Sequence, residues 1–170
     1  MPGSEQQESL FNELVATHRA SIYRICRAYL YDIAEADDLY QEILYQIWKS
    51  LQNFRGQSQI GTWVYRVSVN TAISYNLKNK RRRHMPLSES LQLPYEESLT
   101  NKYEQEMQLR QLHQAISQLP AAERLIISLV LEDKSYKNIA EITGASVSHT
   151  GVKISRIKTR LLQLINKNRS

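Results

Sequence analysis

The sequence contains a single cysteine, Cys26. One thiol cannot form an internal disulfide or a cysteine-based zinc site, and such cysteine usage is typical of a reducing compartment. Cys26 lies on an apolar helix face, which favours a buried structural thiol over a redox sensor. The chain also lacks an apolar run near the ~20 residues that span a bilayer. The polar segment Met1–Glu8 has no signal-peptide core, so we expect a cytoplasmic protein.

Residues that perform catalysis are equally scarce. Four histidines are scattered along the chain: His18, His84, His113 and His149. Their spacing is not that of metal ligands. No nucleophile–base pair and no phosphate-binding glycine loop is present among the five glycines. We therefore expect no enzyme activity, no metal and no cofactor.

What the sequence does have is helical periodicity, with little of the alternation typical of strands. The expected helices cover residues 9–31, 34–51, 60–82, 102–119, 121–131, 136–143 and 147–166. In the third, Trp63, Val67, Asn70 and Ser74 fall on successive turns. The predicted fold class is all-α, with two small helical domains and a flexible linker. The predicted borders are residues 1–83, 84–101 and 102–170.

The linker is predicted where the helical pattern breaks. From His84 to Thr100 the chain contains Pro86, Pro94, three serines and three glutamates, without a sustained apolar stripe. We expect it to be extended and acidic.

Charge is segregated along the chain. No Lys or Arg occurs between Ala28 and Trp48, a stretch that holds five carboxylates: Asp32, Glu35, Asp37, Asp38 and Glu42. Five of the six residues from Lys78 to Arg83 are basic, and every charge after Gly144 is positive. Like charges repel one another on a helix, so this pattern favours partners of opposite sign. The alternative is a set of solvated faces, with the first acidic residues favoured by the helix dipole.

The last fifty residues contain a helix-turn-helix pattern. Ser135 is a suitable N-cap for the helix to Thr143, and Gly144 permits the left-handed turn that follows. Ile139 and Ile142 are expected to face the core. The final helix places short polar groups near its start and cations along one face, as a helix that reads the major groove does. A plain helical hairpin is the alternative.

Two separate groups of motifs resemble one family. The first group comprises Asp-Asp-Leu-Tyr-Gln-Glu-Ile at residues 37–43, then Trp48, Phe-Arg-Gly at 54–56, Thr-Trp-Val-Tyr-Arg-Val at 62–67 and Asn-Thr-Ala at 70–72. The second comprises Leu-Pro at 119–120, Glu-Arg at 123–124 and the helix-turn-helix to Lys158. Together they resemble an extracytoplasmic-function sigma factor, the compact class with regions 2 and 4 only.

The resemblance implies that the chain binds core RNA polymerase and directs promoter recognition, DNA melting and transcription initiation. The implied partners are the polymerase β′ clamp helices and β flap, and promoter DNA. An anti-sigma factor is a further partner that the resemblance allows, and no small-molecule substrate is implied. The acidic linker would thread the positively charged channels of the polymerase.

The family pattern also assigns residues to these roles. The implied polymerase-binding residues are Asp37, Asp38, Gln41 and Glu42. Those implied for the −10 promoter element are Asn53, Phe54, Arg55, Gly56, Trp63, Arg66, Asn70, Lys78, Lys80, Arg81, Arg82 and Arg83. Those implied for the −35 element are Ser148, His149, Lys153, Ser155, Arg156, Lys158 and Arg160. The loop at 53–59 would capture a flipped base, although Phe54 and Trp63 could instead be core residues.

The sequence departs from the family at two neighbouring positions. Thr150 stands where the family commonly has an aliphatic core residue, and Gly151 stands inside the recognition helix. Glycine there costs roughly 1 kcal/mol in helix propensity relative to alanine.

Two other functions are consistent with part of the pattern. An ordinary helix-turn-helix repressor or activator would have an N-terminal ligand or dimer domain and bind duplex DNA tightly by itself. An adaptor or decoy would hold a partner helix without touching DNA, but it leaves both basic stretches unexplained.

Overall fold

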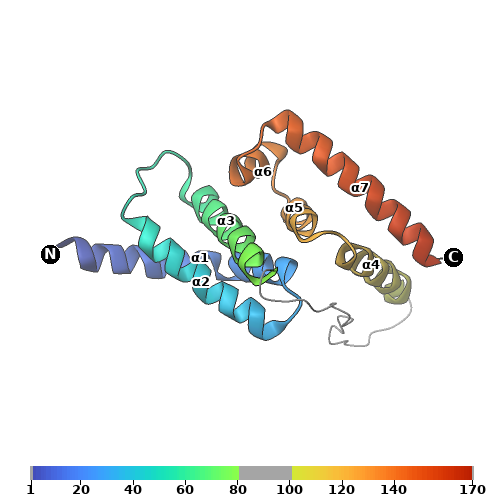
Figure 1. Cartoon of the computed structure of the whole chain (residues 1–170), viewed down its shortest axis with the longest axis horizontal. Helices are drawn as coiled ribbons and strands as arrows, with labels where there is room; N and C mark the ends of the chain where they lie inside the picture. The colour runs from blue at the N-terminus through green and yellow to red at the C-terminus, as the bar shows by residue number, and fades with distance from the viewer. Residues whose placement is uncertain (1, 81–100, 170) are drawn as a thin grey trace.

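The computed structural model describes residues 2–80 and 101–169, and every regular element there is a helix (Figure 1). This confirms the all-α prediction. The helices are α1 Pro2–Tyr29, α2 Ile33–Leu51, α3 Ile60–Lys80, α4 Asn101–Ser117, α5 Ala121–Leu131, α6 Tyr136–Thr143 and α7 Val147–Arg169. In these ranges no helix has the length and apolar character required to cross a membrane.

The bounds of α5 and α6 agree with those expected, but α1 begins seven residues earlier than the predicted Ser9. Contacts with α2 accompany this extension. The Phe11 ring meets Trp48 edge-on with 5.2 Å between ring centroids. The Gln7 side chain donates to the Trp48 carbonyl oxygen at 3.3 Å. Helical periodicity in the sequence does not reveal such contacts between distant residues.

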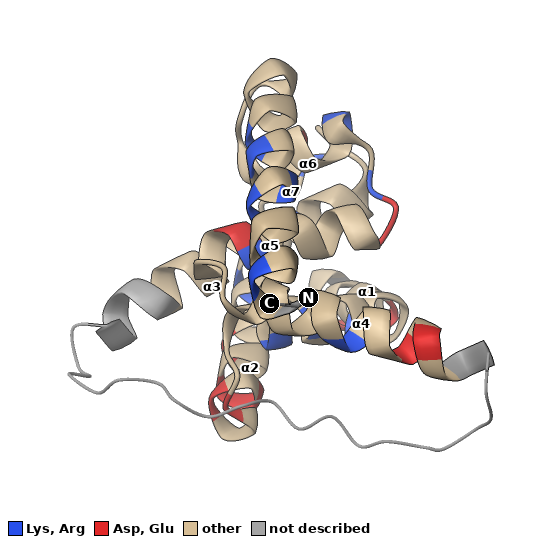
Figure 2. Ribbon diagram, turned by 90° about the vertical axis from the view of Figure 1, so that its right-hand side faces the viewer, with Lys and Arg blue, Asp and Glu red and all other residues tan. Residues whose placement is uncertain are grey.

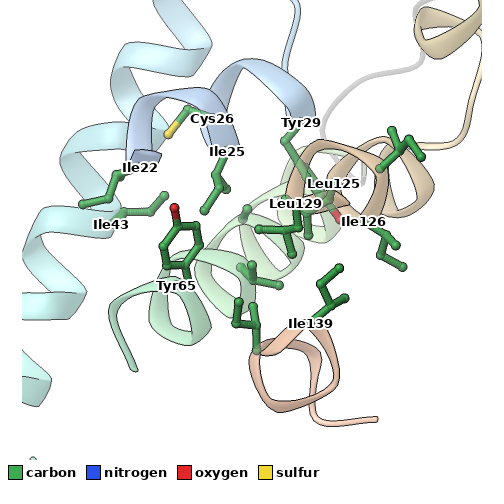
Figure 3. Packing of buried hydrophobic residues seen from close by; sticks show 14 of the residues in the cluster. Ile22, Ile25, Cys26, Tyr29, Ile43, Tyr65, Leu125, Ile126, Leu129 and Ile139 are labelled. Carbon is green, nitrogen blue, oxygen red and sulfur yellow. The ribbon is translucent and has the colours of Figure 1, made fainter. Parts of the chain in front are cut away.

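The helices form two groups that pack against one another. The first contains α1, α2 and α3, and the second contains α4 to α7. Between the groups, α5 lies against α1 and α6 lies against α3 (Figure 1). One buried hydrophobic cluster runs through both groups. Figure 3 shows Ile25 and Tyr29 of α1 beside Leu125 and Leu129 of α5.

The helix α3 is covered on two sides, and this corrects the expected stripe. Asn70 and Ser74 are exposed, whereas the helix buries five other residues: Val64, Tyr65, Ser68, Val69 and Ala72. The hydroxyl of Ser68 is satisfied by donating to the Val64 carbonyl oxygen at 2.8 Å. A helix buried against two neighbours has no single narrow apolar stripe.

Cys26 is fully buried in the first group, as predicted. Burial raises the pKa of its thiol to about 12. Because thiolate is the reactive form of cysteine, this residue is a structural thiol.

Candidate polymerase and nucleic-acid interface

The acidic block on α2 divides into a capping part and an outward part. The Asp32 side chain accepts from the Glu35 backbone N–H at 2.9 Å and caps the helix. Asp37, Asp38 and Gln41 are exposed. Figure 2 shows the acidic residues gathered at one end of α2. Helix capping therefore accounts for Asp32 but not for the outward side chains.

Glu42 differs from its three neighbours in the predicted set. It is half-buried, and its Oε1 accepts from the Gln46 side chain at 2.9 Å. One turn away, Asp38 remains exposed on the same side of α2. Glu42 therefore forms the less exposed edge of the acidic face, and Asp38 and Gln41 form its exposed part.

The loop between α2 and α3 combines a fixed aromatic pair with free polar side chains. The Phe54 and Trp63 rings lie 5.1 Å apart and are tilted by 44°. Both are half-buried, whereas Asn53 and Arg55 are exposed. Gly56 has φ of 70°, in the left-handed region that favours glycine. Phe54 thus packs against Trp63 without being fully buried, and its contact with DNA stays a prediction.

On α3, the residues predicted to bind DNA differ in their exposure and in their hydrogen bonds. Asn70 is exposed, but Arg66 is half-buried. The Arg66 Nε donates to the Glu141 carbonyl oxygen of α6 at 3.0 Å. The predicted Lys78 and Lys80 lie on the last turn of α3. Arg81, Arg82 and Arg83, and nearly all of the predicted linker, lie outside the described residues.

The helix-turn-helix has the turn chemistry that the sequence predicts. The Ser135 hydroxyl accepts from the Asn138 N–H at 3.1 Å. Gly144 has φ of 74° and donates its N–H to the Ala140 carbonyl oxygen at 2.9 Å. Ser146 then caps α7 by accepting from the His149 N–H at 3.1 Å. Ile139 and Ile142 are buried, which confirms the expected core face.

The outer face of α7 carries the predicted −35 residues. Figure 2 shows Lys and Arg spaced along this helix. Six residues of the set are exposed: Ser148, His149, Ser155, Arg156, Lys158 and Arg160. Lys153 is half-buried. Arg160 is paired with Glu123 of α5, with 2.7 Å between Nη1 and Oε2.

Of the two departures from the family pattern, Thr150 has a structural explanation and Gly151 has none. Thr150 is 3% exposed, and its hydroxyl donates to the Ser146 carbonyl oxygen at 2.8 Å, so a polar residue fills the core position without an unsatisfied group. A Cβ at Gly151 would lie 3.7 Å from the Tyr136 ring. That is an ordinary van der Waals distance, so this contact does not require a glycine at the position.

Tyr136 is a residue that sequence reasoning missed. It opens α6, is 41% exposed and lies 3.5 Å from Lys158 Nζ through its hydroxyl. Tyr136 thus adds an aromatic ring to the basic surface of α7. No local sequence pattern indicates this contact, because Tyr136 and Lys158 lie 22 positions apart.

Two family descriptions match the two groups of helices. Sigma-70 region 2 matches residues 14–82, and Sigma-70, region 4 matches residues 109–161. Both ranges lie within the predicted domains, and relatives that cover 89–100% of this chain are named sigma factors. The chain belongs to the extracytoplasmic-function sigma factors. We call α1–α3 region 2 and α4–α7 region 4.

This sigma factor is similar over its whole length to RNA polymerase sigma factor SigV of Bacillus subtilis. The two are 28% identical over 172 residues, which span 100% of each chain. The ECF RNA polymerase sigma-E factor of Escherichia coli K12 is 28% identical over 161 residues, which span 89% of this chain and 84% of that one. A sigma factor directs RNA polymerase to promoters, so the predicted function in transcription initiation is confirmed at this level.

Solved structures share the fold of this sigma factor. The sigma factor RpoE of Bartonella quintana, in complex with the anti-sigma factor NepR, gives a TM-score of 0.73 at 20% identity and covers 92% of this chain and 96% of its own. CnrH in complex with the cytosolic domain of CnrY gives 0.64 at 19% identity, with 94% and 90% covered.

Proposed function

We propose that this sigma factor binds core RNA polymerase through the acidic face of α2, made by Asp37, Asp38, Gln41 and Glu42. The observation that carries the proposal is the exposure of the first three side chains. An exposed carboxylate row suits arginine-rich helices of a partner, because the guanidinium group binds carboxylates in a bidentate manner. Clamp helices of the β′ subunit are the proposed partner of this face.

The loop after α2 and the start of α3 are proposed to open the −10 element. Extracting a base costs a few kcal/mol, which one or two stacking and hydrogen-bond contacts offset. Asn53 and Arg55 are exposed for such bonds, beside the Phe54–Trp63 ring pair. The basic run from Lys78 to Arg83 is proposed to follow the duplex phosphates.

We propose that α7 enters the major groove of the −35 element. Ser148 and His149 stand at its start, where base edges are read, and Arg156 lies two turns further along. Region 4 would also meet the β flap. The polymerase supplies the chemistry, so the chain itself is not a catalyst, and the proposed place of action is the cytoplasm.

An anti-sigma factor is a further proposed partner. The support is that CnrH and RpoE, which share the fold, were solved with CnrY and the anti-sigma factor NepR.

Run-off transcription with purified core polymerase tests the proposal. The chain added to core should yield transcripts from promoters of its native host, and core alone should not. Failure on every genomic promoter would contradict the proposal. A salt titration of promoter binding adds a second readout. We expect weak binding by the isolated chain and strong, salt-dependent binding with polymerase, whereas tight binding alone would indicate an ordinary repressor or activator.

A further inference from the structure

A small cavity lies among four helices of the chain. Its volume is about 150 Å³. Residues of α3, α5, α6 and α7 line it, and these helices can be followed in Figure 1. An apolar cavity of this size holds a molecule as large as benzene. The cavity therefore has room for a ligand with one ring or a short aliphatic chain.

The inner wall of the cavity is apolar. Four of its side chains are at most 6% exposed: Val69, Leu125, Ile126 and Ile139, of which the last three are labelled in Figure 3. Two threonines also line the cavity, and their hydroxyls are already engaged. Thr143 donates to the Ile139 carbonyl oxygen and Thr150 to the Ser146 carbonyl oxygen, both at 2.8 Å. The inner wall therefore suits an apolar group, because a polar group buried there without a partner would lose free energy.

The rim of the cavity is basic. His149 and Lys153 lie four residues apart on α7, and both line the cavity. His149 is exposed, whereas Lys153 is half-buried. The lining contains no Asp or Glu, and none of the residues that the structure describes forms an ion pair with Lys153. A half-buried ammonium without a counter-ion favours an anion beside it, because a partly desolvated charge gains from pairing.

One side of the cavity faces solvent. Ile73 of α3 is 38% exposed, and Ala122 near the start of α5 is exposed as well. A ligand that enters past these two residues would place its apolar body against the inner wall. Its other end would remain at the rim, beside Lys153. The cavity is therefore divided in the way that an amphipathic ligand is divided.

We propose that this cavity binds a small carboxylate with an apolar body, of the size of benzoate or hexanoate. The apolar wall selects the body of the ligand, and the ammonium of Lys153 selects its charge. One ammonium matches the single charge of a carboxylate, which favours it over a phosphate. Binding is a property of the chain alone. Because His149 and Lys153 are also proposed to bind the −35 element, the bound ligand would oppose promoter binding, and this consequence rests on the proposed function.

Methyl-resolved NMR of the full chain tests the site without polymerase or DNA. Benzoate should shift the methyl signals of Ile126 and Ile139, with a dissociation constant of about 1 mM or below for a ligand of this size. Benzamide keeps the ring without the charge and should bind about tenfold more weakly. Acetate keeps the charge without the ring and should leave both signals in place.

Hexanoate extends this comparison to an aliphatic body. The tighter of benzoate and hexanoate identifies the body that the cavity prefers, and binding of neither well above that concentration would overturn the proposal. Equal binding of benzoate and benzamide would overturn it as well, because the charge would then have no part in recognition.

Two lysines of α7 provide matched variants. Lys153→Gln removes the ammonium at the rim, and Lys158→Gln removes the same charge from an exposed residue outside the lining. The affinity for benzoate should fall about tenfold in Lys153→Gln and stay within about twofold in Lys158→Gln, where solvent and salt screen the charge. The affinity for benzamide should be alike in both variants. Equal losses of benzoate affinity would refute the role of Lys153.

Ala122 gives an independent check of the cavity itself. Ala122→Leu places a larger side chain in the lining, and leucine is a good helix former. Ala122→Ser leaves the room nearly unchanged. Benzoate binding should be lost in the leucine variant and retained in the serine variant, with unchanged circular dichroism of both. Retained binding in Ala122→Leu would place the ligand elsewhere and overturn the proposal.

Run-off transcription with core polymerase then tests the consequence for DNA. Saturating benzoate neutralises Lys153 and should lower transcription by the unaltered chain several-fold. Ala122→Leu lies outside the proposed DNA-binding set and should transcribe equally with and without benzoate. Equal inhibition of both chains, or inhibition of neither, would overturn the consequence. A chain that binds benzoate as described but directs no transcription would contradict the proposed function and leave the site standing.

Discussion

The acidic face of α2 differs from the basic surfaces of α3 and α7 in how far its residues contact the rest of the fold. Asp37, Asp38 and Gln41 are exposed and lie away from the junction of the two regions. Arg66 and Lys153 lie at that junction. The proposed polymerase-binding surface is therefore accessible to a partner, whereas part of the proposed DNA-binding surface is engaged within the chain.

The largest effect should come from reversing charge on the acidic face. Asp38→Arg with Glu42→Arg places two cations opposite the proposed arginines of the partner. Because buried charge pairs at interfaces are worth several kcal/mol, affinity for core should fall about a hundredfold or more. The measurement is titration of labelled chain with core polymerase.

Glu8→Arg with Glu13→Arg is the matched control for this change. Both residues are exposed on α1 and carry the same charge outside the proposed face. Affinity for core should stay within a few-fold of the unaltered chain. Equal losses in the two double variants would mean that net charge, and not the α2 face, governs binding.

The basic surface can be divided by comparing Arg156 with Arg160. Arg156 is exposed on α7, whereas Arg160 is held by Glu123 at 2.7 Å. Removing a direct DNA contact costs about 1–3 kcal/mol, so Arg156→Ala should weaken −35 binding by the holoenzyme about tenfold or more. Arg160→Ala should weaken it less and lower stability by under ~1 kcal/mol. Footprinting against salt, with denaturant melts of each variant, separates the two effects. A larger DNA defect from Arg160→Ala would reverse this assignment.

Much of this fold follows from local chemistry that can be read directly. The limits of α6 are marked by Ser135 and Gly144, whose hydrogen bonds cap the helix as expected. By contrast, the hydrogen bond from Arg24 to the Glu132 carboxylate joins residues that lie 108 positions apart in the chain. Glu132 looks like an ordinary turn residue until α1 is packed beside it, so no local pattern could indicate its role.

The site is predictable to a similar extent and for the same reason. Exposure of Asp38 and Arg156 follows from which side of an amphipathic helix they occupy. The engagement of Arg66 depends on the second buried side of α3, which only docking of region 4 creates. Hydrophobic periodicity indicates which side of a single helix faces a core. It does not reveal a second side that is buried only when another region packs against the helix.

Two glycines of the helix-turn-helix should respond in opposite directions to alanine. Gly144 has φ of 74°, a conformation that costs an L-residue roughly 1–2 kcal/mol. Gly151 is helical, and a methyl group there would make an ordinary contact with Tyr136 at 3.7 Å. Gly144→Ala should lower the free energy of unfolding by about 1 kcal/mol, and Gly151→Ala should raise it by up to ~1 kcal/mol. Urea melts measure both, and destabilisation by Gly151→Ala would show that the Tyr136 contact is tighter than it looks.

The smallest effect concerns pH and the imidazole of His18. Burial and the nearby Lys134 ammonium lower the pKa of His18 below its usual value. Its ring also meets Tyr65 edge-on at 6.4 Å. The folded chain therefore binds fewer protons than the unfolded chain as pH falls from about 6.5. The contribution of His18 to stability is present above that pH and is lost as pH falls toward its folded pKa.

Thermal melts at pH 7.5 and 5.5 measure this loss, and His18→Gln should reduce the difference between them. An undiminished pH response in His18→Gln would place the protonated group elsewhere in the molecule.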